Sequence, residues 1–206
     1  MYLLKKLRII LTRCFPDLVH SRANCDYQAT LNESDVLWQG SKLASMGEDM
    51  DGMLISSVNK FTAEVIEALP PSVRILASYS AGFDHVDLSA VKRRGITVTN
   101  TPGVMSEATA DIALLLLLAT ARRAREGLDL ARSGEWSGWA PKQLLGIHFS
   151  EKKLGIIGNG LIGQALARRA RALNMEVHYH NRSRLNRDKE EGAIYHDSLN
   201  SLLTIS

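Results

Sequence analysis

Residues Lys152–Arg184 read KKLGIIGNGLIGQALARRARALNMEVHYHNRSR, and four local patterns follow one another in this stretch. The apolar run at Leu154–Ile157 is typical of a buried parallel strand. Gly158–Gly163 then has the spacing G-x-G-x-x-G. Alanine and leucine recur at helical spacing over Gln164–Leu173, and Glu176–His180 predicts a second strand. The stretch therefore predicts a β-α-β unit of about the usual 30 residues.

Each glycine of this motif has a physical role in a dinucleotide site. Gly158 would allow a tight turn, Gly160 would let the backbone approach a pyrophosphate, and Gly163 would let helix and strand pack closely. The free N–H groups at the start of the helix would face the phosphates. A purely structural glycine turn is the alternative, but the position between a strand and a helix favours dinucleotide binding.

The segment that follows the second strand predicts which dinucleotide is bound. An NAD site carries an Asp or Glu about 20 residues after the glycines, to bind the ribose 2′-OH. Here His180 is followed by Asn181, Arg182, Ser183 and Arg184. Guanidinium groups and a hydroxyl bind a 2′-phosphate, which a carboxylate would repel. We therefore predict a preference for NADP(H) over NAD(H); the alternative is a solvated basic turn.

Composition sets limits on the class of protein. The chain has 206 residues, of which 45% are hydrophobic and 23% charged, as in ordinary globular domains. The net charge of +3 is too small to indicate nucleic-acid binding.

Cys14 and Cys25 lack metal-ligand or redox spacing and predict free thiols in a reducing compartment. The longest apolar run, Ile112–Ala121, is too short to cross a bilayer. An organelle presequence is a weak alternative, and we expect a cytoplasmic protein without a metal site.

The first half of the chain alternates apolar runs with helix-like segments, which is typical of a parallel α/β unit. Helices are expected near Phe61–Leu69, before Pro70-Pro71, and near Leu88–Arg94, before Gly95. The expected strands lie near Leu7–Leu11, Asp35–Trp38, Gly52–Ile55, Arg74–Ser78 and Ile96–Thr99.

Ser78–Asp87, which we call the small-residue turn, follows one of these strands. Such a turn exposes backbone N–H groups at the carboxyl end of a sheet, where α/β folds bind ligands. The N–H groups of Ala81 and Gly82 are therefore candidates for binding an anion, although an ordinary turn explains the same spacing. His85 is expected to be a hydrogen-bonded structural histidine rather than a catalyst.

A turn at Asn100–Gly103 predicts a domain boundary. Ser106 is expected to cap a helix whose middle, Leu114–Leu118, is apolar on all sides. Such a helix must be buried between layers or in a subunit contact. The loop that follows carries Trp136 and Trp139, which could anchor a partner subunit, cover the site or serve only local packing.

Taken together, the sequence resembles the D-isomer-specific 2-hydroxyacid dehydrogenases, especially their glyoxylate/hydroxypyruvate reductase branch. The resemblance covers nearly the whole chain, and the combination and order of its motifs are highly specific. The motifs are SAGFDHVDL at Ser80–Leu88, TNTPGVMSEATADIALLLLLATAR at Thr99–Arg122, EW at Glu135-Trp136, GIIGNGLIGQALARRA at Gly155–Ala170 and YHNRSR at Tyr179–Arg184.

The resemblance implies an α/β fold of two domains with parallel sheets and helices on both faces. Residues 1–101 would form a flavodoxin-like substrate-binding domain without its C-terminal return. Residues 102–206 would form an incomplete Rossmann domain that binds NAD(P). The implied reaction is hydride transfer between NAD(P)H and a small 2-keto acid such as glyoxylate or hydroxypyruvate, in a homodimer, with no nucleic-acid or membrane partner.

The resemblance also implies roles for individual residues. Ala81 and Gly82 would hold the substrate carboxylate, and Thr109 would lie near the nicotinamide. The pyrophosphate would contact Gly158, Gly160, Leu161, Ile162 and Gly163, and the adenosine ribose phosphate would contact Asn181, Arg182, Ser183 and Arg184.

The catalytic Arg, acidic residue and His of the family lie past the position that matches Ser206. No catalytic role is therefore expected for His85, His148 or His180. We expect the 206-residue chain alone to be inactive. The alternative is a non-catalytic protein that binds a dinucleotide or dimerises.

Overall fold

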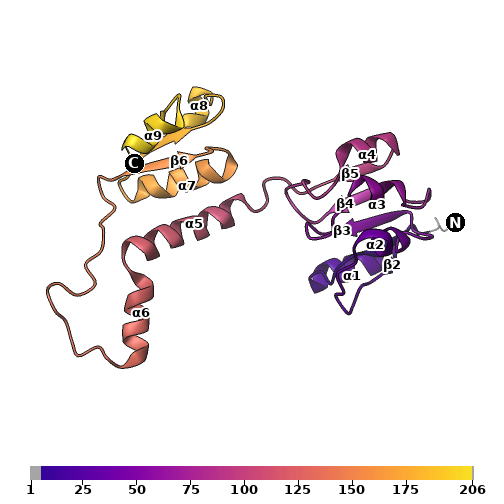
Figure 1. The fold of residues 1–206 in the computed structure, drawn as a ribbon, viewed down its shortest axis with the longest axis horizontal. Coiled ribbons are helices and arrows are strands. Elements are labelled where there is room, and N and C mark those ends of the chain that lie inside the picture. Colours follow the sequence, from indigo (N-terminus) through magenta and orange to yellow (C-terminus); the bar gives the residue numbers. More distant parts are fainter. Residues whose placement is uncertain (1–5, 206) are drawn as a thin grey trace. The chain divides into compact units, whose positions relative to one another are not determined.

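The computed structural model describes residues 6–205 of the chain. It forms two compact units, Met1–Val104 and Met105–Ser206, which we call unit 1 and unit 2 (Figure 1). The division falls one residue after the Asn100–Gly103 turn.

Unit 1 contains a five-stranded parallel sheet. Its strand order is β2-β1-β3-β4-β5, the order of flavodoxin-like doubly wound folds. Because all pairs are parallel, the carboxyl ends of the strands meet at one edge. The α/β prediction is confirmed. The strands are β1 (Arg8–Leu11), β2 (Gln28–Thr30), β3 (Gly52–Ile55), β4 (Ile75–Ser78) and β5 (Thr97–Thr99).

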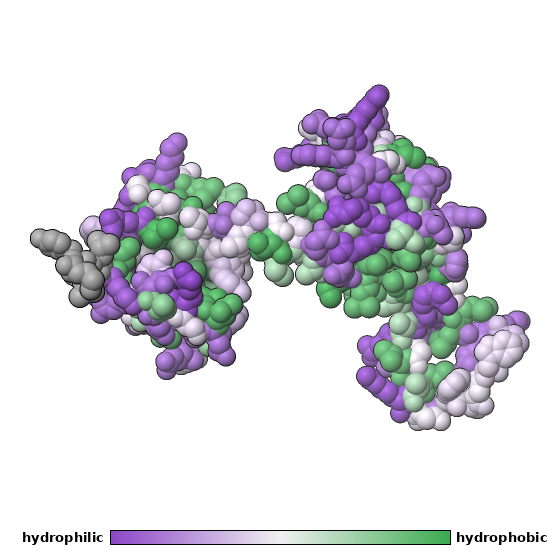
Figure 2. Space-filling model, turned by 180° about the vertical axis from the view of Figure 1, so that it is seen from behind, coloured by the Kyte–Doolittle hydropathy of each residue, from purple (hydrophilic) through white to green (hydrophobic). Residues whose placement is uncertain are grey.

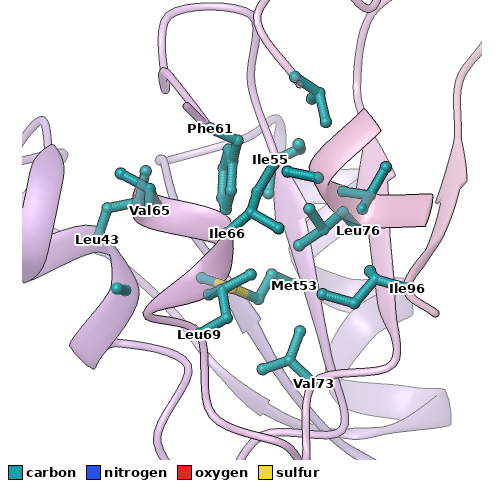
Figure 3. Packing of buried hydrophobic residues seen from close by; sticks show 14 of the residues in the cluster. Leu43, Met53, Ile55, Phe61, Val65, Ile66, Leu69, Val73, Leu76 and Ile96 are labelled. Carbon is teal, nitrogen blue, oxygen red and sulfur yellow. The ribbon is translucent and has the colours of Figure 1, made fainter. Parts of the chain in front are cut away.

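The main core of unit 1 lies between one face of this sheet and three helices, α2 (Gly40–Ser45), α3 (Ala63–Glu67) and α4 (Leu88–Arg93). Figure 3 shows Leu43 of α2 and Ile66 of α3 packed toward the strand residues Met53 and Leu76. Alternate strand residues point to the opposite face, as the two-residue period of a strand requires.

The opposite face of the sheet is covered by α1 (Asp17–Asp26), whose Ala23 packs with Leu11 and Phe15. Beside α1 the face carries an open hollow of about 700 Å³, lined by apolar residues that include Leu18 and Ile75. Helices therefore lie on both faces, as predicted, but one face is only partly covered within the described part of the chain.

The predicted strand at Asp35–Trp38 is wrong, since these residues pair with no strand among those described. The neighbour of β1 is instead β2, which is only three residues long. Asp35 has a φ of 50°, in the left-handed region, and its carboxylate accepts two hydrogen bonds of 2.7 Å from Arg13. It also accepts a bond of 2.8 Å from the Cys14 N–H, so the segment folds back as a loop.

Unit 2 contains a three-stranded parallel sheet in the order β6-β7-β8. The helix α7 (Leu161–Ala172) connects β6 to β7 and packs against both strands and against α5 (Figure 1). Three ion pairs of 2.6–2.8 Å join Arg168 and Arg169 of α7 to Glu107 and Asp111 of α5. The other elements are α5 (Ser106–Ala121), α6 (Ala124–Ser133), β6 (Lys153–Ile157), β7 (Glu176–His180), α8 (Arg187–Glu190), β8 (Ile194–Tyr195) and α9 (Leu199–Ile205).

The predicted cap of α5 is wrong. Ser106 is not its cap; Met105 occupies that position, and no side-chain hydrogen bond caps the helix. The leucine-rich middle is not buried between layers of the described chain, since Leu115 and Leu116 are 58% and 60% exposed. The other possibility, a subunit contact, stays a prediction. Figure 2 shows apolar surface on unit 2 near the segment that contains α6. No helix between residues 6 and 205 is long and apolar enough to span a membrane.

Candidate functional site

Gly158–Gly163, which we call the glycine turn, joins the end of β6 to the start of α7. Gly158 has a φ of +92°, which side chains disfavour, and its N–H donates to the His180 carbonyl at 2.9 Å. A Cβ on Gly163 would lie 2.7 Å from the Gly158 carbonyl oxygen, so a side chain there would clash with the backbone. The first and third glycines therefore allow this tight connection between strand and helix.

The start of α7 presents several unused polar groups. The cap position is Gly160, which has no side chain, and the N–H groups of Leu161, Ile162 and Gly163 donate no hydrogen bond within the described residues. A Cβ on Gly160 would meet no heavy atom within 4 Å, so open space lies beside it. The buried amide of Asn159 also has no partner for its Oδ1 or Nδ2 in this part of the chain. Unpaired donors at a helix start suit a pyrophosphate, so the turn fits a dinucleotide.

Residues 181–184, which we call the basic loop, follow β7 directly. Asn181 points back to the glycine turn, where its Oδ1 accepts a hydrogen bond of 2.6 Å from the Asn159 N–H. Arg182 and Ser183 are exposed and make no hydrogen bond or ion pair with other residues in the range 6–205. Arg184 is different, because its guanidinium is paired with Glu190 at 2.8 Å.

Glu190 belongs to a buried cluster that sequence analysis missed. Its carboxylate accepts hydrogen bonds from Arg184 and from the Tyr179 hydroxyl, which lies at 2.7 Å. These bonds lower the pKa of Glu190 from its ordinary value of 4.5 to about 2, so the group is ionised at neutral pH. The Tyr195 ring lies under the Arg184 guanidinium, 5.6 Å from its central carbon. The sequence of the basic loop alone does not indicate that Arg184 pairs with Glu190.

Thr109 lies exposed near the start of α5, and its N–H bonds to the Met105 carbonyl at 2.9 Å. No described hydrogen bond or ion pair joins it to the glycine turn, so its predicted place near a nicotinamide stays a prediction.

In unit 1, the small-residue turn follows β4 at the carboxyl edge of the sheet. Ala81 and Gly82 are exposed, and their N–H groups donate no hydrogen bond within residues 6–205. Their carbonyls are fixed instead: Asn100 Nδ2 donates to the Ala81 oxygen at 2.6 Å and Ser80 Oγ to the Gly82 oxygen at 2.8 Å. Two free N–H groups on a held backbone can bind a carboxylate.

His85 is buried, with 3% of its surface exposed, and its Nε2 lies 3.1 Å from Ser78 Oγ. Burial lowers the pKa of His85, so the ring is neutral at physiological pH. A buried, hydrogen-bonded ring agrees with a structural role. No group of three metal-ligating side chains gathers anywhere in the described range 6–205.

A second polar cluster lies at the same edge of the sheet and was not predicted. Thr12 Oγ1 donates to Asn59 Oδ1 at 2.7 Å, and the same oxygen accepts from the Ser56 N–H at 3.2 Å. Thr12 and Asn59 are fully buried. This cluster ties together the ends of β1 and β3, and so holds the edge next to the small-residue turn.

Comparison with known proteins finds relatives of similar sequence. The glycerate dehydrogenase of Hyphomicrobium methylovorum is 40% identical over 205 residues, which cover 98% of this chain and 64% of the relative. The glyoxylate reductase of Pyrococcus furiosus is 39% identical over 195 residues, 92% of this chain and 58% of the relative. The chain thus spans less than two thirds of the length of these relatives.

Solved structures of similar sequence have the same fold. A D-isomer specific 2-hydroxyacid dehydrogenase of Polaromonas sp. JS6 66, described as NAD-binding, is 41% identical with a TM-score of 0.91, covering 98% of this chain and 63% of that one. A glyoxylate reductase of Paecilomyes thermophila is 30% identical with a TM-score of 0.82, covering 98% and 63%.

The family model described as "D-isomer specific 2-hydroxyacid dehydrogenase, catalytic domain" matches residues 22–198. This range contains both the small-residue turn and the glycine turn. The chain therefore belongs to the D-isomer specific 2-hydroxyacid dehydrogenase family.

Proposed function

We propose that the protein is an oxidoreductase that uses NADPH to reduce a small 2-keto acid such as glyoxylate or hydroxypyruvate. The observation that carries this proposal is the glycine turn, with three unpaired N–H groups at the start of α7 and a basic loop at the end of the adjacent strand. The names of the relatives support the substrate class, since they include glycerate dehydrogenase and glyoxylate reductase.

In this proposal unit 2 binds the dinucleotide and unit 1 binds the substrate, with residues 1–101 as the substrate domain and 102–206 as the dinucleotide domain. The Leu161 and Ile162 N–H groups hold the pyrophosphate, while Arg182, Ser183 and Arg184 bind the ribose 2′-phosphate. The bound nucleotide would supply the hydride. Ala81 and Gly82 would orient the acid by holding its carboxylate through their N–H groups.

The proposal includes no proton donor from this chain. His85 is buried against Ser78 and its lowered pKa keeps it neutral, so it is poorly suited to protonate a developing alkoxide. We therefore infer that the 206-residue polypeptide binds NADPH without turning over glyoxylate. The family resemblance places the catalytic Arg, acidic residue and His beyond residue 206.

The test is a fluorescence titration of the purified chain with NADPH and with NADH. Tighter binding of NADPH, with no oxidation when glyoxylate is added, is the expected result. Equal affinity for the two nucleotides would remove the NADP preference, and absence of binding would remove the dinucleotide function. The intact mass of the protein in its source cells completes the test: a mass above 22.7 kDa would point to a working reductase with further residues.

A second candidate function is dimerisation without catalysis. It is favoured by the exposed leucines of α5 and by the exposed Trp136 and Trp139, which line a hollow of about 330 Å³ with Leu130 and Leu144. Two results together would favour this function: the purified chain forms a stable dimer that binds NADPH, and the chain has a mass of 22.7 kDa in its source cells. In the proposed enzyme the same surface forms the homodimer contact.

A further inference from the structure

An ionised carboxylate lies beside the loop that we propose to bind a phosphate. The Glu190 side chain is only 9% exposed, whereas the Arg184 side chain that it contacts is 59% exposed. An acid next to an anion site is unfavourable by charge alone, because like charges repel. Charge alone therefore does not explain why Glu190 lies there, but a role in orienting a neighbouring side chain would.

The contacts fix the orientation of one guanidinium edge. Arg184 donates from Nε to Glu190 Oε1 at 2.8 Å and from Nη2 to Oε2 at 3.1 Å. This two-point bond uses the side of the guanidinium and leaves Nη1 without a described partner. Glu190 is itself held by the buried Tyr179 hydroxyl at 2.7 Å, and that hydroxyl also accepts from the Leu185 N–H at 3.1 Å.

The same cluster is connected to the glycine turn. The ring of Tyr195 lies against the Arg184 guanidinium, and its hydroxyl lies 3.5 Å from the Asn181 carbonyl oxygen. Asn181 in turn accepts from the Asn159 N–H of the glycine turn. A continuous set of contacts therefore links the turn that would hold the pyrophosphate to Arg184.

We propose that Glu190 is a positioning residue for the dinucleotide, which holds Arg184 with Nη1 directed to the ribose 2′-phosphate and thereby sets the preference for NADPH. The inference rests on the proposed function, because it requires that unit 2 binds a dinucleotide. A guanidinium already fixed by a bidentate bond and an aromatic ring loses little conformational freedom when the phosphate binds.

The alternative makes the opposite prediction. If Glu190 only neutralised Arg184, its replacement by an uncharged residue would add one net positive charge and strengthen NADPH binding. If Glu190 orients Arg184, the same replacement frees the guanidinium and weakens NADPH binding. The sign of the change therefore distinguishes the two roles.

The experiment measures the Kd of NADPH and of NADH for the full 206-residue chain and for four variants: Glu190→Gln, Glu191→Gln, Arg184→Lys and the double variant that combines Glu190→Gln with Arg184→Lys. We expect Glu190→Gln to raise the NADPH Kd about tenfold, the scale of one charge-assisted hydrogen bond, and to leave the NADH Kd unchanged. Glu191→Gln is the matched control, since Glu191 is the adjacent acid and pairs with Arg171 at 3.4 Å instead; both constants should stay unchanged.

Arg184→Lys keeps the positive charge but cannot form the two-point bond, so it should lose NADPH affinity to the same extent. In the double variant the two losses should not add, because both changes remove one arrangement. Because Arg184 is largely exposed, Arg184→Lys should stay folded even if Glu190→Gln does not. The circular dichroism spectrum of Arg184→Lys checks that this variant is folded.

Three results would overturn the inference while leaving the proposed function intact: tighter or unchanged NADPH binding in Glu190→Gln, an unchanged Kd in Arg184→Lys, or equal losses in NADPH and NADH affinity. If the unmodified chain binds neither nucleotide, the proposed function fails and the inference fails with it.

Discussion

Two glycines of the glycine turn differ in what surrounds them, so the same substitution should have different effects. A Cβ at Gly163 would lie 2.7 Å from the Gly158 carbonyl oxygen and 3.0 Å from Asn159 Oδ1. Gly163→Ala should therefore force α7 away from β6, and we expect a loss of about 1–3 kcal/mol in the free energy of unfolding. Thermal or urea denaturation of the purified chain measures this.

Gly160→Ala is the matched variant, because a Cβ there meets no heavy atom within 4 Å and the φ of −81° suits alanine. It should leave the unfolding free energy nearly unchanged but obstruct the approach of a pyrophosphate, so that NADPH binding is lost. If Gly160→Ala binds NADPH normally, the open space beside Gly160 is not the phosphate site.

The pKa of Glu190 predicts an acid-sensitive contribution to stability. The group has a pKa of about 2 when folded and near 4.5 in the ordinary state, so protonation favours the unfolded chain. The stabilisation is complete above about pH 4.5 and is lost as the pH falls toward 2. The difference in melting temperature between the unmodified chain and Glu190→Gln should therefore shrink over this window. A constant difference would mean that folding does not lower the pKa of Glu190.

At the scale of residues, the spacing of the glycines predicted the tight turn between strand and helix. It did not predict that Glu190 lies beside the basic loop. The glycine roles depend on local backbone geometry, which a short motif encodes. Glu190 meets Arg184 and Tyr179 only because α8 folds back toward β7. Contacts of this kind depend on tertiary structure, so a basic run alone could not show which of its side chains is already paired.

At the scale of elements, two helix starts can be compared: one has a side-chain cap, and the other was predicted to have one but does not. Asp87 Oδ1 accepts from the Ala90 N–H at 2.8 Å at the start of α4, whereas Ser106 makes no capping bond at the start of α5. Asp87→Ala should cost about 1 kcal/mol of stability, and Ser106→Ala should cost almost nothing. Chemical denaturation of both variants checks the difference; similar losses in the two would contradict it.

The elements that were predicted well are those with a strong local pattern. The strands Gly52–Ile55 and Glu176–His180 have the predicted bounds, because dense apolar runs or alternation mark them. The helix α1, with the sequence DLVHSRANCD, was not predicted, because it buries little more than Ala23 and has almost no apolar stripe. The strand β2 is equally weak, since only pairing with β1 defines its three residues.

At the scale of the whole molecule, each unit leaves apolar surface exposed within the described chain. In unit 1 it is the hollow beside α1, and in unit 2 it is Leu115 and Leu116 of α5 together with the exposed Trp136 and Trp139. The apolar middle of α5 predicted that this helix lies between layers or in a subunit contact, but the sequence could not show that α7 covers only one side of it within the described residues. Surfaces of this kind commonly mark an interface.

We expect the α5 surface to be covered by a second copy of the chain, so the purified protein should have twice the mass of 22.7 kDa in light scattering. Burying Leu115 and Leu116 in a dimer would contribute about 1.5–3 kcal/mol per side chain. Replacing both by Glu places charges in that contact and should yield monomers that stay folded, because both residues are exposed in the single chain. Leu18→Glu, at the exposed rim of the hollow in unit 1, is the control and should leave the dimer intact. Dissociation by Leu18→Glu, with no effect of the α5 changes, would instead place the contact on the open face of the unit 1 sheet.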